Sequence, residues 1–109
     1  MERIEELEQQ VIQWHYDRNL IDGATDKDQV LKLIQEVGEL SDNVCKGQDI
    51  RDDCGDIMVV LINIMERNRV SMEECLSVAY EDIRNRKGRM VDGIFVKDGY
   101  DKTITPYHE

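Results

Sequence analysis

Residues 57–65 read IMVVLINIM, a run in which Asn63 is the only polar side chain. A helix through this run is apolar on every side, and such a helix is normally covered all round by the rest of the fold. The run falls well short of the roughly 18 apolar residues that indicate a membrane span. We therefore expect a central helix from a cap near Asp49 to about Asn68, buried under other helices.

Two further helices are predicted before this central helix. Residues 2–18 and about 26–46 carry apolar side chains three or four positions apart, the spacing of one helix face. Gly23 breaks the chain between them, and Thr25 or Asp26 can cap the second helix. In the second helix we expect a buried stripe, which consists of Val30, Ile34, Val37, Leu40 and Val44.

The C-terminal part of the chain changes character at Gly88. A fourth helix opens at Ser71, because Glu74 three residues later completes a capping box. After Gly88 the helical period is lost, and β-branched and aromatic residues surround two Asp-Gly pairs, which are turn signals. We expect a short hairpin or an extended arm over about 89–109.

These elements predict an all-α fold, a four-helix bundle-type domain followed by the short hairpin or arm. A chain of 109 residues suits one domain, with a helical core over about 2–88. In a monomer of this size one side of the central helix would face water. Exposing about four large apolar side chains would forfeit roughly 1.5–3 kcal/mol each. We therefore expect a homo-oligomer, at least a dimer.

The charge balance excludes several classes of partner. The chain has 24 acidic and 14 basic side chains, a formal net charge of −10 at pH 7. Nucleic acid and anionic membranes need a basic surface, so we expect neither as a partner. A polyphosphate can still bind where a metal cation bridges it to the protein. Three cysteines without CxxC spacing, and the lack of a signal peptide, favour a cytoplasmic protein.

Two pairs of carboxylates stand three residues apart, Glu36 with Glu39 and Asp53 with Asp56. Residues three apart on a helix lie about 60° apart around its axis, so each pair points one way. If the second and third helices pack antiparallel, the four acids converge. Like charges at such density are tolerated where cations separate them, and oxygen-only ligands suit Mg²⁺ or Mn²⁺. Such ions commonly serve phosphoryl chemistry.

Lys32 and Asn63 accompany these acids in the helical register. Lys32 lies on the face of Glu39, and Asn63 lies on the face of Asp56. A buried amide needs a partner or costs on the order of 1–3 kcal/mol. That partner is either a ligand or site carboxylate, or an ordinary interhelical hydrogen bond. The acidic pairs have a plainer interpretation too, as solvated faces in a chain rich in acids.

The sequence resembles the MazG-like all-α nucleoside triphosphate pyrophosphohydrolases. Glu36-Val-Gly-Glu39, thirteen residues, then Asp53-Cys-Gly-Asp56 is similar to the ExxE…ExxD signature of that family. The residues around these motifs, KLIQEVGEL and GDIMVVLIN, also resemble the family, and RNRKGRMVDGIFVK resembles the ending of small bacterial and phage members. The third carboxylate is usually glutamate in the family, so Asp53 is one methylene shorter.

The resemblance implies Mg²⁺-dependent hydrolysis of a (deoxy)nucleoside triphosphate to the monophosphate and pyrophosphate. The four carboxylates would hold the metal, with Mn²⁺ as a substitute, and one of them would orient or deprotonate the attacking water. It also implies dimers or dimers of dimers, and a role in nucleotide-pool house-cleaning. Larger family members carry a lysine where this chain has Asp82, so that role is not carried over.

Candidate substrate-binding residues are cations and an aromatic side chain near these motifs. Lys32, Arg86 and Lys87 are candidates for the triphosphate, with Arg84 and Arg89 as weaker ones. The alternative for the RNRKGR cluster is that it complements the dipole at a helix C-terminus. Trp14 is a candidate to stack on a base, although a lone tryptophan on an amphipathic helix is more often in the core. We expect His15 at the surface and Asn19 in a loop.

Two other protein classes compete with the hydrolase. A non-enzymatic helical bundle that dimerises as an adaptor or regulator explains the acidic surface and the apolar helix. It does not explain Asn63, or Lys32 in register with the acids. A di-iron carboxylate bundle needs Glu-x-x-His pairs, which His15 and His108 do not supply.

Overall fold

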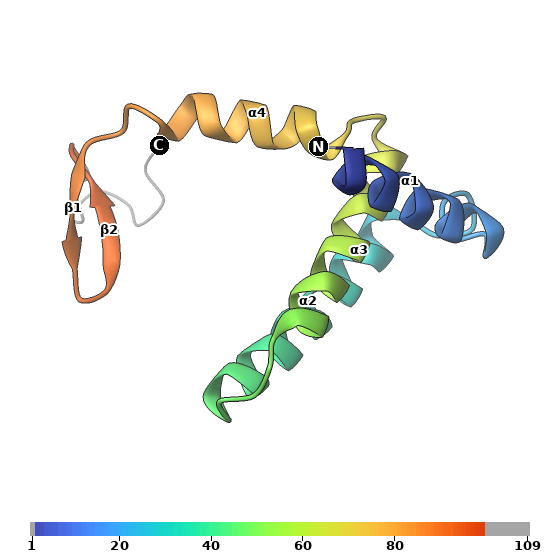
Figure 1. The fold of residues 1–109 in the computed structure, drawn as a ribbon, viewed down its shortest axis with the longest axis horizontal. Coiled ribbons are helices and arrows are strands. Elements are labelled where there is room, and N and C mark those ends of the chain that lie inside the picture. The colour runs from blue at the N-terminus through green and yellow to red at the C-terminus, as the bar shows by residue number, and fades with distance from the viewer. Residues whose placement is uncertain (1, 100–109) are drawn as a thin grey trace. The chain divides into compact units, whose positions relative to one another are not determined.

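The computed structural model of the protein describes residues 2–99. It contains four helices and a two-stranded hairpin, which confirms a mostly helical protein (Figure 1). In chain order the elements are α1 (Glu2–Asp17), α2 (Asp26–Cys45), α3 (Arg51–Arg67), α4 (Met72–Ile83), β1 (Gly88–Val91) and β2 (Ile94–Lys97). No helix among these residues is long and apolar enough to cross a membrane.

The described residues form two compact units, 2–75 and 76–99, with the boundary inside α4. We describe each unit by itself. The expected single domain, with a helical core to about 88 and an arm beyond it, stays a prediction. Residues 100–109 of that arm lie outside the described part of the chain.

The first unit is built on a helical hairpin. Helices α2 and α3 run side by side and antiparallel, joined by residues 46–50, and α1 packs against α3 (Figure 1). Gly47 ends α2 with a positive φ of 68°, a conformation that costs glycine little. The N-cap of α3 is Ile50, without a side-chain capping bond, so the predicted cap Asp49 lies one residue before the true one. Asp49 accepts a hydrogen bond from the backbone N–H of Arg51.

The predicted capping box at Ser71 is confirmed, and of the two candidate caps for α2 Thr25 is the actual one, also in a capping box. Thr25 Oγ1 accepts from the N–H of Asp28, whose carboxylate accepts from the N–H of Thr25. Ser71 and Glu74 make the same reciprocal pair at the start of α4. These bonds satisfy backbone donors that a helix start otherwise leaves unpaired. They need only residues three apart, which is why the sequence shows them.

The apolar interior of the first unit is small. Among the described residues, the fully buried apolar side chains are Ile21, Val60 and Ile62. The predicted buried stripe on α2 is wrong for a single chain, because members such as Ile34 and Val44 stay 62% and 56% exposed. The main packing partner of α2 is α3, and much of its remaining apolar surface stays exposed among the described residues.

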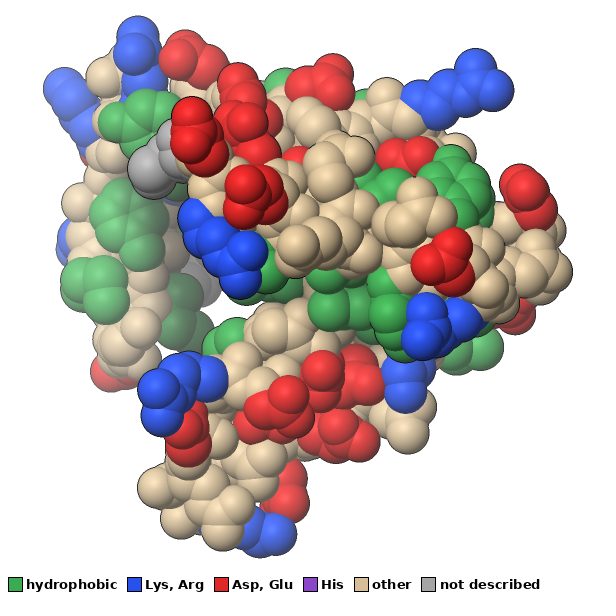
Figure 2. Space-filling model, turned by 45° about the vertical axis from the view of Figure 1, so that its right-hand side comes forward, with side chains coloured by type: hydrophobic (Ala, Val, Ile, Leu, Met, Phe, Trp, Pro, Cys, Tyr) green, Lys and Arg blue, Asp and Glu red, His purple; other side chains and the backbone are tan. Residues whose placement is uncertain are grey.

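The central helix α3 shares this lack of cover. Val60, Ile62 and Asn63 are buried, whereas Met58, one turn before Ile62, is exposed. The expectation of cover on every side is therefore not met within one chain. Figure 2 shows apolar side chains reaching the surface beside acidic ones on the face drawn.

The second unit carries the hairpin, which decides between the two predictions for this segment. Strands β1 and β2 are antiparallel, with Gly88 opposite Lys97 and Val91 opposite Ile94. The turn between them is Asp92-Gly93, with φ of 50° and 82°. Positive φ at both central residues is the signature of a type I′ turn, which favours Asp-Gly and matches the twist of hairpin strands.

Candidate metal centre

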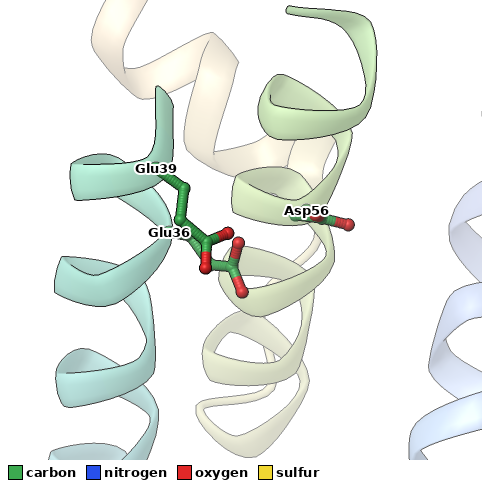
Figure 3. A group of neighbouring side chains, drawn as sticks. All are labelled: Glu36, Glu39 and Asp56. Carbon is green, nitrogen blue, oxygen red and sulfur yellow. The ribbon is translucent and has the colours of Figure 1, made fainter. Parts of the chain in front are cut away.

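Three of the four predicted carboxylates come together between α2 and α3. Glu36, Glu39 and Asp56 each offer an oxygen, and these atoms lie within 4.8 Å of one another. Figure 3 shows the first two projecting from α2 and the third placed on α3. We call Glu36, Glu39 and Asp56 the acidic triad. The antiparallel packing predicted from the short connection produces it.

Glu36 is the buried member of the triad. Its side chain is only 8% exposed, and Lys32 Nζ lies 3.1 Å from Oε1. The second oxygen, Oε2, is also buried and has no hydrogen-bond partner among the described residues. A buried carboxylate oxygen without a donor is costly, so this atom fits a site that receives a cation.

The other two members of the triad, Glu39 and Asp56, also lie close to other carboxylates. The pKa of Glu39 is raised above its ordinary value, first by a hydrogen bond that it can make to Glu36 and then by the negative charge of Glu36. That bond forms only when one of the two carboxyls holds a proton. When both carboxyls are ionised they repel each other, and a bound cation would remove this repulsion.

Asp56 is partly buried, and burial is the largest cause of its raised pKa. The charges of Asp52, Glu36 and Asp53 raise it further, while Lys32 acts in the opposite direction. One lysine thus faces several carboxylates. The oxygen-only donor set and its excess negative charge suit a hard divalent ion such as Mg²⁺ or Mn²⁺.

Asp53 is near the triad but is held separately. Its carboxylate is buried, and Asn43 Nδ2 lies 3.0 Å from Oδ1 and 2.9 Å from Oδ2. Asn43 was not among the site residues predicted from the sequence. Its position could have indicated it, because Asn43 lies seven residues after Glu36, and seven residues return a helix position to within about 20°.

Asn63 makes the interhelical bonds that were one of its two predicted alternatives. Its side chain is fully buried, with Nδ2 at 3.2 Å from His15 Nδ1 and 3.0 Å from the carbonyl oxygen of Leu20. No hydrogen bond to Asp56 is found within the described residues. Oδ1 of Asn63 is buried without a partner.

The expectation that His15 lies at the surface is wrong, since it is 2% exposed. Its Nε2 lies 2.9 Å from the carbonyl oxygen of Val59 on α3. A carbonyl only accepts, so Nε2 carries the proton and Nδ1 accepts from Asn63. Its neighbour Trp14 is instead 43% exposed, and the Arg18 guanidinium lies 4.4 Å from the centre of the Trp14 ring. Asn19 follows α1 in a turn, as expected.

The predicted cations fall into both units. Lys32 lies beside the acidic triad, as its ion pair with Glu36 shows. Arg86 and Lys87 belong to the second unit, where Arg86 pairs with Asp82 at 2.6 Å. Arg84 pairs there with Glu81, at 3.6 Å. A role for the second unit's cations in binding a triphosphate stays a prediction.

No protein-family model matches the chain, and no solved structure matches it. The chain is similar to a protein of Haemophilus phage HP1 that is described as an uncharacterized 18.2 kDa protein in the rep-hol intergenic region. The two are 35% identical over 72 residues, which cover 64% of this chain and 44% of the phage protein. The match thus spans less than half the length of that relative.

Proposed function

We propose that this protein is a MazG-like nucleoside triphosphate pyrophosphohydrolase that depends on Mg²⁺, with Mn²⁺ as a substitute. The observation that carries the proposal is Glu36. Its partnerless buried oxygen belongs to a carboxylate grouped with Glu39 and Asp56. The spacing of the acidic pairs and the helical hairpin that joins them support the same conclusion.

The acidic triad would hold the cation. A divalent cation would supply positive charge to a polyphosphate and lower the pKa of a water molecule. Glu36 is fixed by burial and by its ion pair with Lys32, so it anchors the group. Asp56 faces it from the other helix, and the cation would then link α2 to α3.

The remaining chemistry is positioning and proton transfer by the chain's own side chains. Glu39 is the exposed member of the triad, so a water molecule can reach it. A carboxylate within reach of the attacking water can act as its proton acceptor. Glu39 would take the proton as the water oxygen bonds to the α-phosphorus. The bond from that phosphorus to the pyrophosphate oxygen breaks in the same displacement.

Candidate substrate contacts of the first unit are exposed polar and aromatic side chains. Lys32 is half exposed, so its ammonium can pair with a phosphate as well as with Glu36. Trp14 presents a partly open ring for a nucleobase. The bonds of Asn63 instead support a structural role between α1 and α3.

The test is pyrophosphate release from a panel of ribo- and deoxyribonucleoside triphosphates with Mg²⁺. We expect pyrophosphate and monophosphate, no activity in EDTA, and recovery with Mg²⁺ or Mn²⁺. Glu36→Gln should lose most activity while circular dichroism stays that of a helical protein. Asp42→Asn is the matched control, because Asp42 lies on the same helix and pairs only with Lys46. Full activity of Glu36→Gln, or equal loss in both variants, would contradict the site.

The exposed apolar faces also support a second candidate, a non-enzymatic helical-bundle protein that acts through dimerisation. The two functions differ in the assay above. A stable dimer that releases no pyrophosphate from any nucleotide, with either cation, would favour the second candidate. Release that depends on Glu36 would exclude it.

A further inference from the structure

Asn43 and Asp53 form a polar bridge between the two helices that carry the acidic triad. Asn43 lies near the end of α2 and Asp53 in the first turn of α3. The Asn43 amide nitrogen is within 3.0 Å of both oxygens of the Asp53 carboxylate. The hydrogen bonds found for residues 2–99 give Asp53 no other side-chain donor.

The bridge keeps the carboxylate oxygens of Asp53 bonded to Asn43, although Asp53 is a neighbour of the acidic triad. Asp53 lies three residues before Asp56 on α3, a spacing that puts two side chains on one side of a helix. Its oxygens, however, are not among those that lie within 4.8 Å of one another. Asp53 is therefore a neighbour of the triad whose carboxylate is bonded to the Asn43 amide.

We propose that Asn43 is a positioning residue that holds Asp53 out of the cation site, so that the site offers three carboxylates instead of four. This inference rests on the proposed cation site and concerns its ligand number and affinity. To become a ligand, Asp53 must leave the Asn43 amide. Breaking a hydrogen bond to a buried charge opposes that movement and weakens cation binding.

Loss of the amide should therefore tighten the site. In Asn43→Ala the buried Asp53 carboxylate has no donor, and a cation becomes its best available partner. We expect the cation to bind about tenfold more tightly, the factor that one hydrogen bond to a charged group corresponds to. The gain should require Asp53 and should be absent from the Asn43→Ala/Asp53→Asn double variant.

The experiment is a Mn²⁺ titration of the whole chain, in which electron paramagnetic resonance measures the free ion. It compares wild type, Asn43→Ala, Asp53→Asn and the double variant, with melting temperatures measured with and without Mn²⁺. Asn68→Ala is the matched control, because it removes another amide that bonds across the first unit, at the far end of α3. If Asn43→Ala does not fold, Asn43→Leu takes its place, because it keeps a similar volume and has no donor.

Tighter binding in Asn43→Ala that vanishes in the double variant, with Asn68→Ala unchanged, supports the inference. A lower melting temperature with unchanged Mn²⁺ affinity means that Asn43 is only structural, and it overturns the inference while the cation site stands. Weaker binding in Asn43→Ala overturns it as well. If wild type binds no Mn²⁺, the proposed function itself fails.

Discussion

The Asn63 amide nitrogen lies 3.2 Å from Nδ1 of His15, and this pair joins α3 to α1 in the interior of the first unit. The same nitrogen also donates to the carbonyl oxygen of Leu20, in the loop that follows α1. One side chain thus fixes both the helix and the loop against α3. The buried amide in the apolar run is explained by this contact.

Asn63→Ala should destabilise the protein by about 1–3 kcal/mol, because it leaves Nδ1 of the buried His15 without its donor and removes one of the bonds to the Leu20 carbonyl. His15→Ala should cost a similar amount, and the double variant should cost less than the sum. Urea unfolding at one fixed protein concentration measures these differences. Additive losses would show that the two side chains do not act as a pair.

The crowded carboxylates predict a pH dependence of stability in the absence of metal. An acid whose pKa is higher in the folded chain binds its proton more tightly there, so its favourable contribution is lost as the pH rises through that pKa. For Asp56 this loss begins above the ordinary value of 3.8. In EDTA, the melting temperature of Asp56→Asn relative to wild type should therefore rise from about pH 4 to pH 7.

Comparison with the variant isolates Asp56, because carboxylates such as Asp49, whose pKa is lowered by bonds from Arg51, are present in both proteins. With Mg²⁺ at pH 7 the order should reverse, since only wild type keeps the full ligand set. A difference in melting temperature that stays constant with pH, in EDTA, would show that Asp56 is not under electrostatic strain.

Asp53→Glu should be tolerated and should bind Mg²⁺ more tightly than wild type. The added methylene lets the carboxylate reach beyond the Asn43 amide, toward the triad. Calorimetric titration with Mg²⁺ and the pyrophosphate assay measure the two effects. Complete inactivation would instead mean that the spacing of α2 and α3 is specific for aspartate.

The protein should be an obligate homo-oligomer, at least a dimer. Full burial of exposed apolar side chains on α2 and α3, such as Ile34 and Met58, by a second copy would stabilise the dimer by roughly 1.5–3 kcal/mol for each side chain. Folding and association would then be linked, so the melting temperature should rise with protein concentration. Sedimentation at micromolar concentration should show a mass above the 12.7 kDa of one chain.

A pair of variants tests whether α2 supplies the contact. Ile34→Glu and Gln35→Glu add the same charge at neighbouring exposed positions of α2. Only the first should lower the mass or the melting temperature, because it places a carboxylate within an apolar interface. An active, monodisperse monomer of wild type would contradict the prediction of an obligate oligomer.

The sequence by itself determined the features whose partners are a few residues apart. The capping boxes at Thr25 and Ser71 and the turn at Asp92-Gly93 depend on local backbone geometry, so residue types at fixed spacing identify them. The shared face of Glu36 and Glu39 is local in the same sense. These signals were enough to predict the helices, the hairpin and the position of an acidic site.

Only the tertiary structure decided which side chains meet across helices. The burial of His15, its bond to Asn63, and the bridge from Asn43 to Asp53 depend on how each helix is rotated against its neighbour. Spacing along one helix fixes which residues share a face, but it does not fix which face turns toward the next helix. That rotation follows from packing of the whole unit. It places Asp53 in hydrogen bonds with Asn43, while the acidic triad comes together.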